Sequence, residues 1–147
     1  MPPTDFLLNE YPNARAAYSL RKLSSGHTGP CINVRRSSGG TQDIGFVDGQ
    51  LDEAALLAFV GGGDGFVNTW YDQSGNGLNA VQTNSVFQPP IVKNGFVVKI
   101  GGRPVIEFRA ADRHRLRAFG FQIASGPLGI FIISTWPDRG FAPVVDH

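Results

Sequence analysis

The sequence predicts an all-β fold, a mostly antiparallel β-sandwich with one short helix at about residues 52–60. The chain has 19 glycines and 10 prolines among its 147 residues, which favours many turns and short elements. Several short runs alternate apolar with polar side chains, as strands with one solvated face do. Turn-forming residues separate these runs at spacings of roughly ten residues, which is typical of sandwiches.

In chain order, the first half should contain an edge strand and then strands on either side of the helix. The expected strands cover residues 18–23, 31–36, 43–47 and 65–71, and a short helix over residues 13–17 is a further expectation. The helix at 52–60 begins with Asp52 and Glu53, where the helix dipole favours acids, and Gly61 is placed to end it. We expect this helix to pack against the sheet.

The second half should continue the antiparallel pattern. The expected elements are an extended piece over 78–82, a hairpin of 91–92 with 96–100, a strand over 105–108 and a central strand over 128–136. Lys93-Asn94-Gly95 supplies the turn of that hairpin. The last run is the most apolar in the chain and lies between two prolines, which indicates a buried strand.

Length and charge set limits on the domain organisation and on the partners. A chain of this length fits one domain, which we expect over residues 11–147, preceded by an N-terminal arm over residues 1–10. The net charge of +1 gives no general attraction to nucleic acid or to a membrane, and neither is predicted as a partner. Cys31 is the only cysteine, so an internal disulfide is excluded and a thiolate metal cage is not expected.

The stretch from Trp70 to Gly77 passes from a strand into a polar, glycine-rich loop. We expect Trp70 and Tyr71 to be buried. Tyr71, Asp72, Ser74 and Asn76 are predicted to form a structural loop whose side chains satisfy its own backbone. The alternative is a small Ca²⁺ site with Asp72 and Asn76 as ligands, although a single carboxylate is a poor set for this ion.

The segment from residue 103 to 117, here called the basic segment, is the one clear charge cluster. It holds five arginines against Glu107 and Asp112 and could bind a phosphate or an acidic sugar, or form ion pairs. The residues predicted to bind a sugar are Trp136, Phe87, Arg113 and Arg115.

A glycosidase would need two nearby carboxylates, for which Asp72, Glu107 and Asp112 are the candidates. Glu107 alternates with apolar neighbours, which favours a solvated strand face, and no catalytic residue is predicted.

Several runs together carry a resemblance to a known family. They are Ala17-Tyr18-Ser19-Leu20-Arg21, Thr28-Gly29-Pro30-Cys31-Ile32-Asn33-Val34-Arg35-Arg36-Ser37-Ser38, Trp70-Tyr71-Asp72-Gln73-Ser74-Gly75-Asn76-Gly77 and Gly102-Arg103-Pro104-Val105-Ile106-Glu107-Phe108, then Leu116 and Gly129-Ile130-Phe131-Ile132-Ile133-Ser134. This combination resembles the concanavalin A-like lectin/glucanase (LamG-type) sandwich domains of phage virion and tail proteins. It is more distantly similar to the catalytic domain of arabinofuranosidases of the B type. The resemblance covers roughly residues 11 to 136.

The resemblance implies a jelly-roll sandwich and a place on the extracellular surface of a bacteriophage virion, for example in a tail fibre. The first function that it implies is a non-enzymatic structural module that assembles with copies of itself or with other virion proteins. The second is an adhesin that binds a host surface glycan, and the third is an arabinofuranosidase-like hydrolase. Arabinofuranosidases carry their nucleophile and acid in segments well beyond the one that the Trp70–Gly77 stretch resembles. This sequence contains no equivalent of those segments, so the hydrolase ranks last. Complete sandwiches of this type usually have further strands after Trp136. We therefore expect either a domain cut short whose sheet another chain completes, or a reduced fold whose open edge is capped by an arm.

Overall fold

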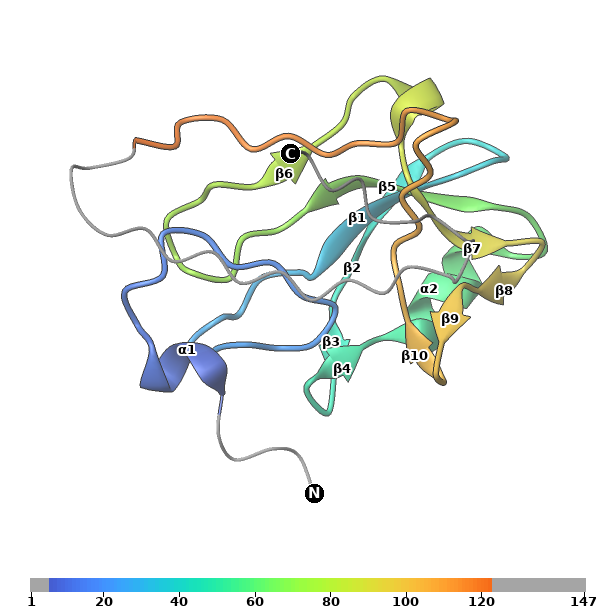
Figure 1. Ribbon diagram of the computed structural model, residues 1–147. Helices are drawn as coiled ribbons and strands as arrows, with labels where there is room; N and C mark the ends of the chain where they lie inside the picture. Colours follow the sequence, from blue (N-terminus) through green and yellow to red (C-terminus); the bar gives the residue numbers. More distant parts are fainter. Residues whose placement is uncertain (1–5, 123–147) are drawn as a thin grey trace, which may run out of the picture.

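The computed structural model describes residues 6–122 and shows mostly antiparallel sheets with a few short helices (Figure 1). The predicted all-β class is therefore confirmed, while the jelly-roll strand order stays a prediction. The largest sheet has six strands in the order β2-β1-β5-β7-β8, with β6 also paired to β5. These strands are β1 (Ile32–Arg36), β2 (Thr41–Ile44), β5 (Gly65–Trp70), β6 (Ala80–Val81), β7 (Pro90–Lys93) and β8 (Phe96–Val97).

Two small hairpins and three short helices complete the described part of the chain. The hairpins pair β3 (Phe46–Val47) with β4 (Gln50–Leu51) and β9 (Lys99–Ile100) with β10 (Arg103–Pro104). The helices are α1 (Leu7–Glu10), α2 (Glu53–Val60) and the 3-10 turn η1 (Ser85–Phe87). Within residues 6–122, no helix has the length and apolar character needed to cross a membrane.

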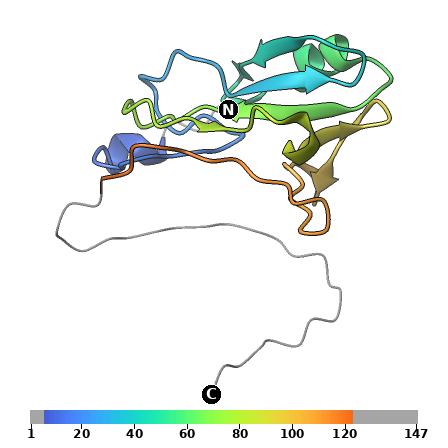
Figure 2. The same ribbon diagram turned by 90° about the horizontal axis from the view of Figure 1, so that it is seen from above.

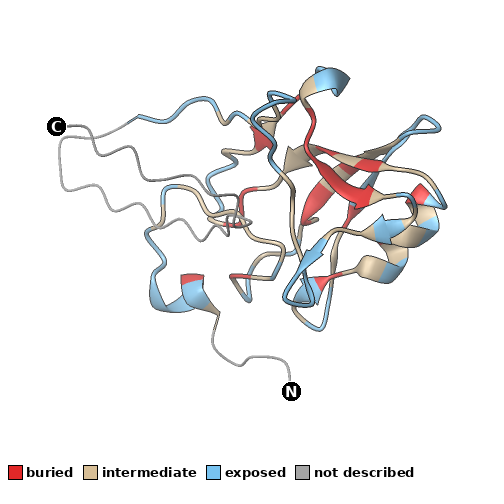
Figure 3. Cartoon of the chain, turned by 45° about the vertical axis from the view of Figure 1, so that its right-hand side comes forward, coloured by how far each residue is buried: buried red, intermediate tan, exposed pale blue. Residues whose placement is uncertain are grey.

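The core lies where α2 packs against the sheet. β1 buries Ile32 and Val34 and leaves Asn33 and Arg35 partly exposed, as its alternating pattern predicts. Figure 3 shows the buried residues gathered in the middle of the sheet. A Cβ added at Gly65 would lie 2.8 Å from Cγ2 of Val60, so the missing side chain lets the helix approach β5 closely.

The predicted helix at residues 52–60 is confirmed as α2. The Asp52 carboxylate accepts a hydrogen bond of 2.9 Å from the N–H of Ala55, which caps the helix start. Gly61 follows with φ of 70°, a left-handed conformation in which glycine ends a helix without strain. Leu56 and Val60 are the helix residues buried against the core.

The edge strand expected over residues 18–23 is absent, and this prediction was wrong. Only an isolated bridge between Arg21 and Gln50 forms there. The backbone groups of this segment are satisfied instead by the Gln73 side chain and by the carbonyl of Gly49, which accepts from the N–H of Lys22 at 2.8 Å. A side-chain amide therefore takes the place of a neighbouring strand.

Three other predicted strands differ from the structure. The strand over 43–47 is divided at Gly45 into the end of β2 and β3, and the strand over 96–100 is divided at Val98 into β8 and β9, which belong to different sheets. Residues 105–108 form no ladder. The N–H of Val105 donates to Val98 O at 2.9 Å and the N–H of Glu107 donates to Pro90 O at 3.0 Å, which is too few bonds for a strand. The predicted strand over 128–136 lies outside the described residues.

The basic segment runs back along the sheet after β10, drawn in orange in Figure 2. It is joined in turn to β7 through Glu107, to η1 through Arg115, and to β6 through a pair of bonds between Arg117 and Val81. Leu116 and Ile106 pack against the core, which leaves the arginines between them toward the surface. The segment thus covers the β7, η1 and β6 side of the sheet.

The N-terminal residues also differ from expectation. No helix forms over residues 13–17; the first helical turn is α1, within the expected arm. Leu8 is buried and its N–H donates to Leu23 O at 2.8 Å, and the Lys22 ammonium lies 5.9 Å from the centroid of the Phe6 ring. Residues 6–10 of the arm therefore dock on their own chain.

Candidate functional site

The loop that follows β5 is organised by the carboxylate of Asp72, which is only 6% exposed. One oxygen accepts from the backbone N–H groups of Ala17 and Ser74, each at 2.9 Å. The other accepts from the Ser74 hydroxyl at 2.8 Å and from the N–H of Leu78 at 3.1 Å. Burial on its own would raise the pKa of Asp72, but these four donors outweigh it and lower the pKa below 3.8. The carboxylate is thus held in its charged form.

The other polar side chains of the loop hold the N-terminal segment against it. The Asn76 amide donates to the carbonyls of Ala14 and Arg15 at 3.1 and 3.0 Å. The Ser74 hydroxyl lies 3.3 Å from the Arg15 carbonyl as well. The structure therefore brings Asp72, Ser74 and Asn76 together in a loop whose side chains bond to backbone groups and, through the Ser74 hydroxyl, to one another.

Gln73 is a structural residue that the sequence did not reveal. It is buried, and its amide nitrogen donates to the carbonyls of Ser19 and Arg21 at 3.1 and 3.0 Å. Its amide oxygen accepts from the N–H of Leu23 at 2.7 Å. These partners lie at least 50 residues away in the chain, so no local spacing could have indicated them.

Trp70 and Tyr71 are half-buried, so the expectation of full burial was wrong for both. The Tyr71 hydroxyl donates to an Asp43 carboxylate oxygen at 2.8 Å at the surface. Burial, followed by this bond and the charge of Asp43, raises the pKa of Tyr71 to about 12. The indole Nε1 of Trp70 is buried, with no hydrogen-bond partner within residues 6–122.

The geometry of the Asp72 loop is that of a hydrogen-bonded turn. Four N–H or O–H hydrogens point at the carboxylate, and the amide nitrogen of Asn76 points at carbonyls. A Ca²⁺ ion would have to displace these donors, because a cation and a donor hydrogen cannot occupy the same lone pair. Over the described part of the chain, no group of three or more His, Cys, Asp or Glu residues gathers to hold a metal.

The other two candidate carboxylates are each engaged by a cation. Glu107 forms an ion pair with the Lys93 ammonium, and Asp112 lies 3.5 Å from the Arg109 guanidinium. Both pairs are partly exposed to solvent. In each case the structure places the candidate in a surface ion pair.

Two of the four predicted sugar-binding residues are in contact. The guanidinium carbon of Arg115 lies 3.9 Å from the centroid of the Phe87 ring, and the Arg115 N–H donates to Phe87 O at 3.0 Å. Arg113 adjoins this pair at φ of 55°, with its carbonyl 3.5 Å from Nη1 of Arg115. Trp136 lies outside the described residues.

A second arginine stack, which the sequence did not indicate, is linked to the first. The Arg35 guanidinium carbon lies 4.6 Å from the centroid of the Phe66 ring on the neighbouring strand. Its Nε donates to Gln88 Oε1 at 2.7 Å, and the buried Gln88 amide donates in turn to Gln82 O at 2.7 Å. Gln82 then donates to the carbonyl of Arg115 at 3.3 Å. Two glutamines therefore hold the two stacks in one network.

Phe66 also lines an open pocket of about 360 Å³, here called the Phe66 pocket. Its apolar part is formed by Phe66 and Pro90. Its polar part is formed by Asp64, Lys93, Asn94, Arg109, Asp112 and His114. The pocket thus lies between the start of β5 and the ion pairs of the basic segment, and it combines hydrogen-bond donors with acceptors around an apolar wall.

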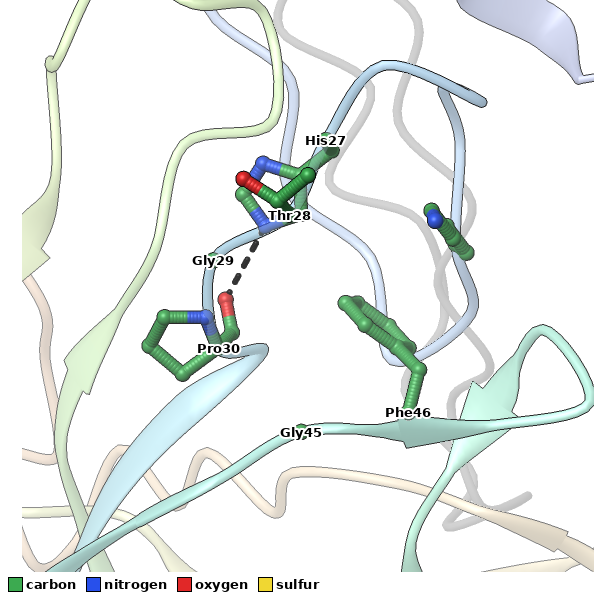
Figure 4. Close-up of a pocket in the computed structure, with 7 residues that line it drawn as sticks. His27, Thr28, Gly29, Pro30, Gly45 and Phe46 are labelled. Carbon is green, nitrogen blue, oxygen red and sulfur yellow. Dashed lines mark hydrogen bonds between the residues drawn. The ribbon is translucent and has the colours of Figure 1, made fainter.

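A second open pocket, of about 410 Å³, lies between the loop at residues 27–30 and β3. Figure 4 shows the Phe46 ring directed toward the loop that carries His27. The two rings meet edge to face, with centroids 6.0 Å apart, and His27 Nε2 lies 3.1 Å from Pro30 O. Among the described residues that line this pocket, only Lys22 carries a formal charge, so the pocket offers fewer groups for recognition than the Phe66 pocket.

Comparison of the chain with family models, with curated proteins and with solved structures found no significant match.

Proposed function

We propose that this chain is a non-enzymatic structural module of a bacteriophage virion that lies on the extracellular surface of the particle. In this proposal it assembles with copies of itself or with other virion proteins. The virion assignment is supported by the resemblance of the Trp70–Gly77 stretch and its companion runs to phage sandwich domains. Its structural character is supported by the Asp72 loop, whose polar groups bond to the chain's own backbone.

The observation that carries the assembly proposal is the position of Phe96. This side chain is 77% exposed, the largest exposed fraction among the large apolar side chains described. It lies on β8, at one end of the six-stranded sheet, where no described strand pairs with the outer edge of β8. An exposed apolar side chain on an unpaired sheet edge favours addition of a strand from another chain.

Solution mass tests this proposal. Phe96→Ser removes the apolar side chain, and Val47→Ser is a matched control because Val47 is also exposed, at 53%, but lies on the β3-β4 hairpin. We expect the wild type and Val47→Ser to form the same oligomer with similar dissociation constants. The dissociation constant of Phe96→Ser should be at least ~10-fold higher. An oligomer that Phe96→Ser leaves unchanged contradicts the role of this edge.

The second candidate function, a carbohydrate-binding adhesin for a host surface glycan, is favoured by the Phe66 pocket. Sugar sites in proteins combine an apolar or aromatic wall with a few convergent polar groups, and this pocket has both. Binding to a glycan array tests this candidate. Binding that is lost on Asn94→Ala would support it, and an array with no bound glycan would contradict it.

A further inference from the structure

The Phe66 pocket suits a ring that carries several hydroxyl groups. Phe66 and Pro90 provide an apolar wall for the C–H face of a sugar ring. Asp64 accepts a bond of 2.8 Å from the N–H of Asn94 through one oxygen, and its carboxylate retains acceptor capacity for a ligand hydroxyl. The side-chain amide of Asn94 offers both a donor and an acceptor. Vicinal hydroxyls, each a donor and an acceptor, match such a lining.

The charges at the pocket differ in how far they are already paired. Lys93 pairs with Glu107, and Arg109 pairs with Asp112. Arg35 is not among the residues that line the pocket, but its guanidinium lies over the Phe66 ring, which is. Within residues 6–122 it has no carboxylate partner, and only its Nε is used, by Gln88. Arg35 is therefore the cation beside this pocket whose charge is left for a ligand.

Arg35 is also held in a fixed orientation. Its guanidinium lies over the Phe66 ring and is bound by the buried Gln88, so both its plane and one of its edges are set. A guanidinium fixed in this way presents its two terminal nitrogens as a fork, which matches the two oxygens of a carboxylate. The Phe66 ring connects this fork with the wall of the pocket.

We propose that the Phe66 pocket binds a carboxylate-bearing sugar of the uronic acid type, with the carboxylate paired to Arg35 and the sugar ring against Phe66 and Pro90. This inference rests on the adhesin candidate described above and specifies its ligand. Single-stranded nucleic acid is a poorer fit, because its successive bases need several aromatic rings to stack on. Among the described residues that line the pocket, the only phenyl ring is that of Phe66.

The test compares two forms of one ligand by isothermal titration calorimetry with the full chain. The probes are trigalacturonate and its methyl ester, which keeps the sugar and removes the charge. We expect the free acid to bind at least ~10-fold more tightly than the ester, the scale of one charge-assisted hydrogen bond. Arg35→Gln should abolish this difference. Arg103→Gln is the matched control because it removes the same charge from an exposed residue on β10, in a different sheet from Phe66, and it should retain the difference.

Arg35→Lys is a second variant that tests the same contact if Arg35→Gln destabilises the sheet. It retains the charge and the aliphatic stem but loses the fork, so the preference for the acid should fall while the unfolding midpoint stays near that of the wild type. Equal binding of acid and ester, unchanged in Arg35→Gln, overturns this inference but leaves the adhesin candidate standing. Binding of neither form counts against both. Equally tight binding of polyglutamate overturns the inference, because any polyanion would then suffice.

Discussion

Replacing Asp72 with alanine should remove a large part of the stability of this domain. The substitution leaves the N–H groups of Ala17, Ser74 and Leu78 without their acceptor, and it removes the nearer acceptor of the Ser74 hydroxyl. A lost partner costs roughly 1–3 kcal/mol for a buried group. Water can reach part of this loop, because Asn76 is exposed. We therefore take the lower end of this range for each of the four donors and expect the free energy of unfolding to fall by about 3–5 kcal/mol.

The loss can be measured by urea unfolding followed through tryptophan fluorescence. Typical domains have a total stability of about 5–15 kcal/mol, so the Asp72→Ala variant should unfold at a much lower urea concentration. Ser74→Ala removes a hydroxyl that donates to Asp72 and accepts from the N–H and the side-chain amide of the exposed Asn76, and it should cost about 1 kcal/mol. If Asp72→Ala costs less than Ser74→Ala, the carboxylate does not organise the loop and the reasoning is refuted.

The same carboxylate should make stability depend on pH at the acid end. Because the pKa of Asp72 is lower in the folded chain than its usual 3.8, the unfolded chain binds the proton more tightly. The contribution of Asp72 is therefore complete above about pH 3.8 and is lost as the pH falls through the folded value. Asp72→Asn should have a smaller loss of stability below this pH than the wild type. Equal acid dependence in both proteins would contradict the assignment.

Two further predictions concern the core. Gly65→Ala should destabilise the domain by about 1–3 kcal/mol in urea unfolding, because the new methyl group would overlap Val60. Gly62→Ala is the control: its methyl group would meet nothing within 4 Å, so its stability should stay near that of the wild type. Equal losses of stability in the two variants would contradict the close packing of α2 on β5. Cys31 is fully buried, and its burial raises the pKa of the thiol to about 12. At pH 8 it should therefore react with a thiol reagent far more slowly in the folded protein than in guanidinium chloride. Equal reaction rates would show that the structure around Cys31 opens readily.

Local patterns were sufficient to predict the elements whose bonds are local. α2 follows from Asp52 at its start and Gly61 at its end, and both act on the neighbouring turn. The alternation along β1 predicts which side chains are buried, because one face of that strand packs on the core. These features are set by residues next to each other in the chain.

The features that the sequence did not reveal depend on distant partners. Residues 18–23 have the pattern of a strand, but Gln73 satisfies their backbone in place of a neighbouring strand. Residues 105–108 also have the sequence pattern of a strand, yet they form only one bond to β7 and one to Val98. The prediction that Phe87 and Arg115 bind a sugar did not indicate that they stack on each other, and the stack of Arg35 on Phe66 arises from the register between β1 and β5.

The mass of the purified chain in solution tests the proposed structural role most directly. One chain weighs 15.8 kDa, and sedimentation equilibrium over a wide range of concentrations measures how many chains associate. If the open edge at β8 and the exposed Phe96 ring serve assembly with copies of this chain, the mass should be a fixed multiple of 15.8 kDa. A mass of 15.8 kDa at every concentration would contradict self-assembly.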